Sequence, residues 1–216
     1  MSEAPSTGPS DPGDPAEYLA ATEFVDSEHP SVVAWARGRI GDAGTDPEKA
    51  SRLFLAVREE LRYDPYAVSR DRSDYKASVI LTQKNTFCVP KAVLLAAGAR
   101  AVGIPARLGF ADVKNHLSSD ELREAMGTDL FVYHGYTELF IDGRWVKASP
   151  AFNESLCHFF GVEPLDFDGV HDALLQPYDQ EGERCMEYVN HRGVFRDLPF
   201  EEIREAFIAT YGVDGF

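Results

Sequence analysis

The sequence predicts an α+β protein, in which helices and an antiparallel hairpin form separate elements. Three observations predict this class. One segment carries a helix capping box followed by an apolar stripe, and a second is apolar on every side of a helix. A third contains two strand-like runs joined by the dipeptide Asp142-Gly143, which is typical of a tight hairpin turn.

The first predicted helix begins after a capping box, Thr45-Asp-Pro-Glu48, with its proline in the first turn. The apolar residues behind it recur at helical spacing: Ala50, Leu53, Phe54, Val57 and Leu61. We expect this helix to end near Tyr63-Asp-Pro65, because the residue before a proline avoids the α region. Residues 66–87 are polar and mixed, and we expect a loop there.

A second helix is predicted over residues 89–102. Its middle is apolar nearly all round, which indicates burial on every side. Pro90 suits its first turn and Gly103 suits the position after its end. A strand-like run follows at residues 106–113, and a short helix is expected from Ser118 to Gly127.

The hairpin is predicted from residues 130–141 and 144–149. If the turn pairs Ile141 with Arg144, then His134, Ser149 and Asn153 share one face of the ladder, although a proline at 150 can end it early. Glu138 and Lys147 are expected to be an exposed cross-strand pair that contributes little. An irregular stretch to about residue 178 and a helix over residues 199–211 complete the chain.

Composition limits the class of protein and of partner. The 216 residues favour one domain over residues 17–216, preceded by a disordered tail, residues 1–16, that is rich in Pro, Gly and Ser. The net charge of −15 and the lack of a basic cluster exclude nucleic acid and anionic membranes as expected partners. No apolar run reaches the length of a membrane span.

Cysteine use indicates the compartment. The three cysteines, Cys88, Cys157 and Cys185, are widely spaced, and no pair has the spacing of a metal site. The N-terminus lacks the basic start and apolar run of a signal peptide. We therefore expect a reduced, cytoplasmic protein without metal or cofactor.

Cys88 and His134 are the candidate catalytic residues. Cys88 comes directly before the buried helix, where unpaired N–H groups and the helix dipole favour a thiolate with a pKa below its usual value. The alternative is a small core residue. His134 lies on a hairpin strand with polar Ser149 and Asn153, as a base and its orienting partner require. The alternative is a histidine bonded to a backbone carbonyl.

These residues fall in motifs that resemble the transglutaminase-like superfamily. The segment Thr86-Phe-Cys88 through Gly103-Ile-Pro-Ala-Arg107 resembles its nucleophile region. His134-Gly-Tyr-Thr-Glu138 resembles its histidine strand, and Trp145-Val-Lys-Ala-Ser149-Pro150 its following strand. The preceding helix, which ends in Leu61-Arg-Tyr63-Asp, also fits the pattern of this family. The resemblance covers about residues 48–155 and leaves residues 156–216 as a C-terminal extension.

The resemblance implies a papain-like architecture, with the cysteine helix packed on the histidine sheet. It also implies attack of Cys88 on a peptide or protein amide, with His134 as base and acid and a thioester as intermediate. Water or an amine would then take the acyl group, and the sequence leaves hydrolysis and transamidation open. The oligomeric state is open too.

One position departs from the family pattern. Ser149 stands where the family has its catalytic aspartate, so we expect Asn153 to orient His134, with Ser149 as second choice. The Cys88 N–H is expected to be one oxyanion donor, and Gln83 or Asn85 the other. The serine also supports an alternative function, a non-catalytic module that keeps the fold and binds a peptide or partner.

Overall fold

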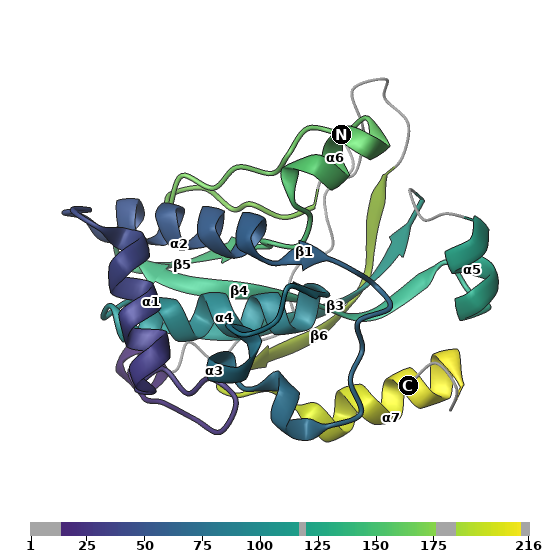
Figure 1. Ribbon diagram of the computed structural model, residues 1–216, viewed down its shortest axis with the longest axis horizontal. Coiled ribbons are helices and arrows are strands. Elements are labelled where there is room, and N and C mark those ends of the chain that lie inside the picture. The colour runs from purple at the N-terminus through teal and green to yellow at the C-terminus, as the bar shows by residue number, and fades with distance from the viewer. Residues whose placement is uncertain (1–13, 117–119, 176–184, 213–216) are drawn as a thin grey trace.

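The computed structural model describes residues 14–116, 120–175 and 185–212 (Figure 1). Its helices are η1 (Pro15–Leu19), α1 (Pro30–Ile40), α2 (Asp46–Glu60), η2 (Arg72–Tyr75), α3 (Ala77–Ile80), α4 (Cys88–Ala101), α5 (Asp120–Met126), α6 (Glu154–Phe160) and α7 (Phe200–Tyr211). Its strands are β1 (Arg62–Tyr63), β2 (Asn85–Thr86), β3 (Ala106–Asn115), β4 (Leu130–Ile141), β5 (Arg144–Ala148) and β6 (Met186–Phe195).

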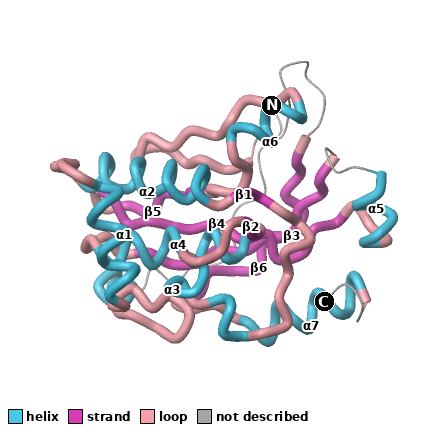
Figure 2. Tube along the Cα trace, viewed as in Figure 1, coloured by secondary structure: helices cyan, strands magenta, loops and turns pink. Residues whose placement is uncertain are grey.

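The predicted α+β class is confirmed. Strands β5, β4, β3 and β6 form one sheet in that order, and every neighbouring pair is antiparallel. The short strands β1 and β2 form a separate parallel pair, and β2 leads directly into α4. Figure 2 shows the helices α1, α2, α3 and α4 gathered beside the strands of the larger sheet.

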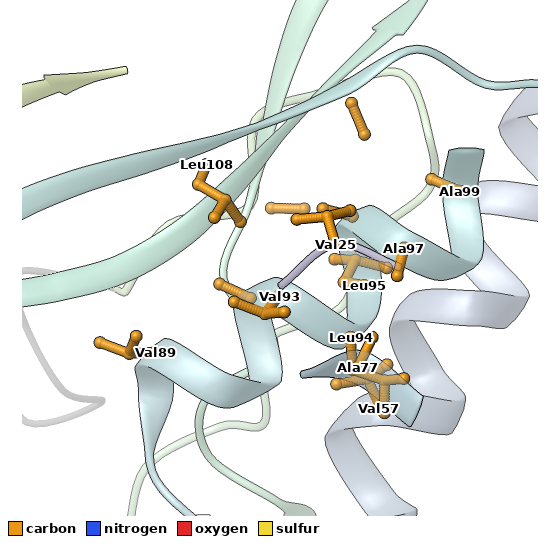
Figure 3. Close-up of a cluster of buried hydrophobic side chains, with 14 of the residues drawn as sticks. Val25, Val57, Ala77, Val89, Val93, Leu94, Leu95, Ala97, Ala99 and Leu108 are labelled. Atoms are coloured by element: carbon orange, nitrogen blue, oxygen red, sulfur yellow. The ribbon is translucent and has the colours of Figure 1, made fainter. Parts of the chain in front are cut away.

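Helix α4 is the centre of the molecule. It packs against α1, α2 and α3 and against strands β3 and β4. Every residue from Cys88 to Arg100 is buried, as its apolar composition predicts. Figure 3 shows its side chains directed to different sides, with Leu94 directed toward Val57 and Ala77. A helix buried on all sides has little freedom to shift, so it holds its first residue in a fixed place.

Helix α2 has the predicted N-terminal capping box. Thr45 Oγ1 accepts a hydrogen bond from the N–H of Glu48 at 3.4 Å, and Glu48 Oε2 accepts one from the N–H of Thr45 at 3.1 Å. At its other end, Lys91 of α4 donates through Nζ to the carbonyls of Arg58 and Leu61, at 3.0 and 2.8 Å. This buried lysine therefore ties α2 to the first turns of α4.

The hairpin has the predicted register. Ile141 pairs with Arg144, and Asp142 and Gly143 have φ values of 49° and 81°, as a type I′ turn requires. The ladder ends at Ala148, two residues before the proline, so Ser149 and Asn153 do not pair with β4 as a continued ladder would require. The polar residues after Ala148 are therefore placed by other contacts.

The structure corrects several expected segments. Residues 66–87 contain η2, α3 and β2 in place of a single loop, and helix α6 interrupts the expected irregular stretch. Residues 15 and 16 of the expected tail belong to η1, whereas residues 1–13 lie outside the described part of the chain, as do Ser118 and Tyr178. Strand β6 was not predicted because most of its residues are exposed at a sheet edge, so it lacks an apolar alternation.

Glu138 corrects another expectation. It does face Lys147 in the ladder, but it is buried and forms its ion pair with Arg107, whose Nη2 lies 2.7 Å from Glu138 Oε2. The Arg107 guanidinium stacks on Trp145, 4.1 Å from the ring centroid. The pair joins β3 to β4 because the two residues are cross-strand partners.

None of the helices among the described residues has the length and apolar character needed to cross a membrane.

Candidate active site

Cys88 is the first residue of α4 and is buried, with 8% of its surface exposed. Its N-cap residue, Phe87, has no polar side chain to cap the helix. The backbone N–H groups of Gly135, Val89 and Cys88 itself lie near the sulfur and favour the thiolate. Burial outweighs them and raises the pKa of the Cys88 thiol to about 11. The expected low-pKa thiolate is therefore wrong for this closed site, and Cys88 is a neutral thiol.

Strand β4 lies directly against the start of α4. A Cβ atom at Gly135 would lie 3.0 Å from Val89 Cα and 3.4 Å from the Cys88 carbonyl oxygen, so a side chain here would require the helix and the strand to move apart slightly. One turn further along the helix, Thr137 Oγ1 donates to the carbonyl of Ala92 at 2.9 Å. These contacts bring the backbone of residue 135, next to His134, to the Cys88 sulfur.

His134 is buried beside Ser149. Its Nε2 lies 3.2 Å from Ser149 Oγ, and its ring meets the ring of Tyr188 edge to face at 6.3 Å. Burial lowers the pKa of His134 to about 4, so the imidazole is neutral at physiological pH. Throughout the described ranges, no hydrogen bond joins the Cys88 thiol to this ring; such bonds often tighten only when substrate is bound.

A protein-family model of the transglutaminase-like superfamily matches residues 33–150, which is more than half of the chain. The chain belongs to the transglutaminase-like superfamily. The matched residues include Cys88, His134 and Ser149, and they end before β6 and α7. The chain has no match among curated proteins.

Two solved structures resemble this transglutaminase-like protein. One is a candidate cysteine protease from Cytophaga hutchinsonii, with 21% sequence identity and a TM-score of 0.49, covering 64% of this chain and 42% of that one. The other is a candidate protease from Parabacteroides distasonis, with 17% identity and a TM-score of 0.42, covering 62% of this chain and 26% of that one. The chain thus spans less than half of either protein.

The structure places Ser149, and not Asn153, against the His134 ring. Asn153 Oδ1 accepts a hydrogen bond from the N–H of Tyr63 at 3.1 Å, and its Nδ2 donates to Ser155 Oγ at 2.6 Å. Asn153 thus joins β1 to the start of α6. The chain turns away after Ala148, and that turn separates Asn153 from the histidine.

The two expected oxyanion donors from the segment before α4 are bonded elsewhere. Gln83 Nε2 donates to the carbonyl of Asp74 at 3.0 Å, and Asn85 Nδ2 donates to Asp64 Oδ2 at 2.6 Å. Both side chains hold the segment that enters α4. Neither is hydrogen bonded to Cys88 in this structure.

A buried carboxylate organises the strand just before His134. Tyr133 has a φ of 54°, an uncommon value for a non-glycine residue, and its N–H donates to Asp112 Oδ1 at 3.1 Å. Arg192 Nε lies 2.9 and 3.0 Å from the two oxygens of Asp112. The β3–β4 register shifts between Ala111, the partner of His134, and Val113. Asp112 and Arg192 therefore hold the bulge beside His134.

Three tyrosines lie near Cys88, and no sequence pattern predicted that their hydroxyls would be close to it. Tyr63, Tyr188 and Tyr211 each interact electrostatically with the Cys88 sulfur. The Tyr211 hydroxyl already has backbone partners. It accepts a hydrogen bond from the N–H of Val132 at 2.7 Å and donates one to the carbonyl of Leu130 at 3.2 Å. Tyr188 and Tyr211 come from the C-terminal extension, where no motif marks them.

The remaining thiols lie in other parts of the fold. Cys157 is buried on α6, and Cys185 is buried next to β6. Within residues 14–116, 120–175 and 185–212, no group of three His, Cys, Asp or Glu side chains is placed to hold a metal ion. The side chains described near Cys88 include an imidazole and hydroxyl groups.

Proposed function

We propose that this protein is a cysteine-dependent acyl-transfer enzyme that acts on peptide or protein amide bonds. The observation that carries the proposal is the contact between the Cys88 sulfur and the N–H of Gly135. This contact sets the sulfur beside the backbone of the residue that follows His134. The His134 ring is in turn held by Ser149. A nucleophile, a base and a group that orients the base are the parts that covalent catalysis requires.

The reaction begins when Cys88 attacks the amide carbonyl carbon. A bond forms between Sγ and that carbon, and the thiol proton passes to His134. Nε2 faces Ser149, so Nδ1 is the nitrogen left to receive it. His134 then gives this proton to the leaving nitrogen as the C–N bond breaks, which leaves a thioester on Cys88. Water or an amine takes the acyl group and restores the thiol.

The protonation states of the resting site shape this mechanism. Cys88 with its raised pKa and His134 with its lowered pKa form a neutral pair, not a thiolate–imidazolium pair. The proton must therefore move during the attack. Ser149 can accept a hydrogen bond from the ring but offers no negative charge to the imidazolium that forms. The reaction therefore depends on other groups to stabilise its developing charges.

The second candidate function is a peptide-binding module without catalysis. The serine at the family's aspartate position and the raised pKa of Cys88 favour it. Under that function, the arrangement around Cys88 and His134 would be kept but the thiol would not form an acyl-enzyme. The two functions differ in one measurable property, which is whether Cys88 accepts an acyl group.

The test is acylation by p-nitrophenyl acetate, a small acyl donor that does not depend on knowledge of the natural substrate. We expect p-nitrophenolate release and one acetyl group on Cys88, located by peptide mapping and removed by hydroxylamine, as a thioester is. Cys88→Ala should abolish both results, and His134→Ala should slow acylation by about 100-fold or more, the range for general-base catalysis.

Cys157→Ala is the matched control, because Cys157 is another buried thiol on a different helix. It should acylate at Cys88 like the wild-type protein. If the folded wild-type protein carries no acetyl group on Cys88, or if acetylation is equal among the three cysteines, the enzymatic function is wrong and the binding module is favoured.

A further inference from the structure

Tyr188 lies in the site although it belongs to the C-terminal extension, outside the residues that match the family. It is on β6 opposite Val113 of β3, and its ring reaches the edge of the His134 ring. Its hydroxyl also interacts electrostatically with Cys88 and Tyr136. The extension thus adds a polar group to the space around the nucleophile and the base.

The Tyr188 hydroxyl is buried and has no hydrogen-bond partner among the described residues. The backbone of Leu175 lies beside its oxygen but does not reach hydrogen-bond geometry. An unpartnered buried hydroxyl costs stability, and most buried polar groups in proteins are paired. A phenylalanine would fill the same space without that cost. The hydroxyl is therefore available to hydrogen bond to a group that is present only during the reaction.

The reaction lacks a hydrogen-bond donor that this hydroxyl can supply. When Cys88 attacks, the carbonyl π electrons move to the oxygen, which becomes negatively charged. No side chain caps the start of α4, so a backbone N–H there can supply one donor to this oxygen, and a second donor is still needed. Gln83 and Asn85, the two other candidates, are bonded to Asp74 and Asp64.

We propose that Tyr188 is a catalytic residue whose hydroxyl donates a hydrogen bond to the substrate carbonyl oxygen as Cys88 attacks it. This proposal rests on the proposed acyl-transfer function. Tyr188 keeps its proton throughout the step, so the only proton that moves is the one from Cys88 to His134. Burial raises the pKa of Tyr188 above its usual value, which keeps the hydroxyl protonated as a donor.

The test compares two electrophilic reagents that react with the same sulfur. Acylation by p-nitrophenyl acetate passes through a charged carbonyl oxygen, whereas alkylation by iodoacetamide does not. Tyr188→Phe should slow acylation of Cys88 by roughly 100-fold, the loss typical of one oxyanion donor. It should leave the alkylation rate within about twofold of wild type. Its melting temperature should stay equal or rise, because an unpartnered hydroxyl has been removed.

Tyr18→Phe is the matched control. It removes the same atom from a tyrosine that packs on Trp145 at the other end of the hairpin, and it should change neither rate. Equal acylation rates in Tyr188→Phe and wild type would overturn the role of Tyr188 alone. Equal slowing of both reactions, or a lowered melting temperature, would assign the hydroxyl a structural partner and also overturn it. If the wild-type protein is not acylated, the proposed function fails first, and this inference fails with it.

Discussion

At the scale of single residues, two opposing effects act on the Cys88 sulfur. The N–H groups at the start of α4 and the Gly135 N–H favour the thiolate, whereas burial favours the thiol. Burial prevails because the sulfur lies in the interior of the fold, so little water remains to solvate a charge. The same enclosure keeps His134 neutral.

This balance predicts the pH dependence of Cys88 alkylation. With a pKa of about 11, the thiolate fraction increases about tenfold per pH unit through the neutral and mildly basic range. The iodoacetamide rate should therefore keep rising beyond pH 9, whereas a cysteine-containing peptide levels off near its usual pKa of about 8.5. The rate is followed by mass spectrometry of Cys88. A plateau below pH 8 would instead show a stable thiolate–imidazolium pair.

At the scale of elements, the site depends on how β4 meets α4 and β3. Gly135 allows the close approach to α4, and Thr137 fixes the strand along the helix. On the β3 side, the bulge at Asp112 receives the N–H of Tyr133 just before His134. Arg192 of β6 hydrogen bonds to the same carboxylate, so an edge strand of the extension supports the strand that carries His134.

Asp112→Asn tests this support. The variant keeps the size of the side chain but loses the charge that pairs with Arg192, and we expect the free energy of unfolding to fall by about 1.5–3 kcal/mol. We also expect slower acylation of Cys88 at a temperature where the variant is fully folded, because His134 is less well positioned.

Glu60→Gln provides the matched control, since it makes the same carboxylate-to-amide change at the exposed pair with Arg39. Its effect on the free energy of unfolding should stay within about 0.5 kcal/mol. An Asp112→Asn protein with wild-type stability and wild-type acylation would show that the bulge does not need this carboxylate.

At the scale of the whole molecule, the fold buries several ionisable groups. Arg107 and Glu138 form a buried pair, Lys91 is enclosed between α2 and α4, and His134 is neutral. Burial lowers the pKa of Lys91 to about 7. Such groups make the global stability depend on pH, because the unfolded chain titrates at ordinary values.

His134 predicts part of the acid unfolding. In the unfolded chain its pKa is near 6.5, and in the fold it is about 4, so the unfolded state binds the proton first. Its contribution to stability is therefore complete above pH 6.5 and is lost as the pH falls to about 4, by about 3 kcal/mol. Urea unfolding of wild type and His134→Gln at several pH values measures it. The stability difference between the two should change by this amount, and a constant difference would contradict the prediction.

The elements whose causes are local could be predicted from neighbouring residues alone. The capping box of α2, the uniformly apolar α4, the Asp142-Gly143 turn and the hairpin register follow from neighbouring residues, and the structure confirms them. The motifs around Cys88 and His134 also placed the chain in its family, which the family match confirms. The catalytic roles of these residues remain predictions.

The groups that meet at the site are brought together by contacts between distant segments of the chain. Ser149 reaches His134 because the chain leaves the ladder after Ala148, and Tyr188 reaches it across β3 from an edge strand without a sequence pattern. The protonation of Cys88 was likewise decided by burial, which depends on every element that packs around α4. Contacts between distant segments and the exclusion of water are properties of the packed molecule, and no short stretch of sequence contains them.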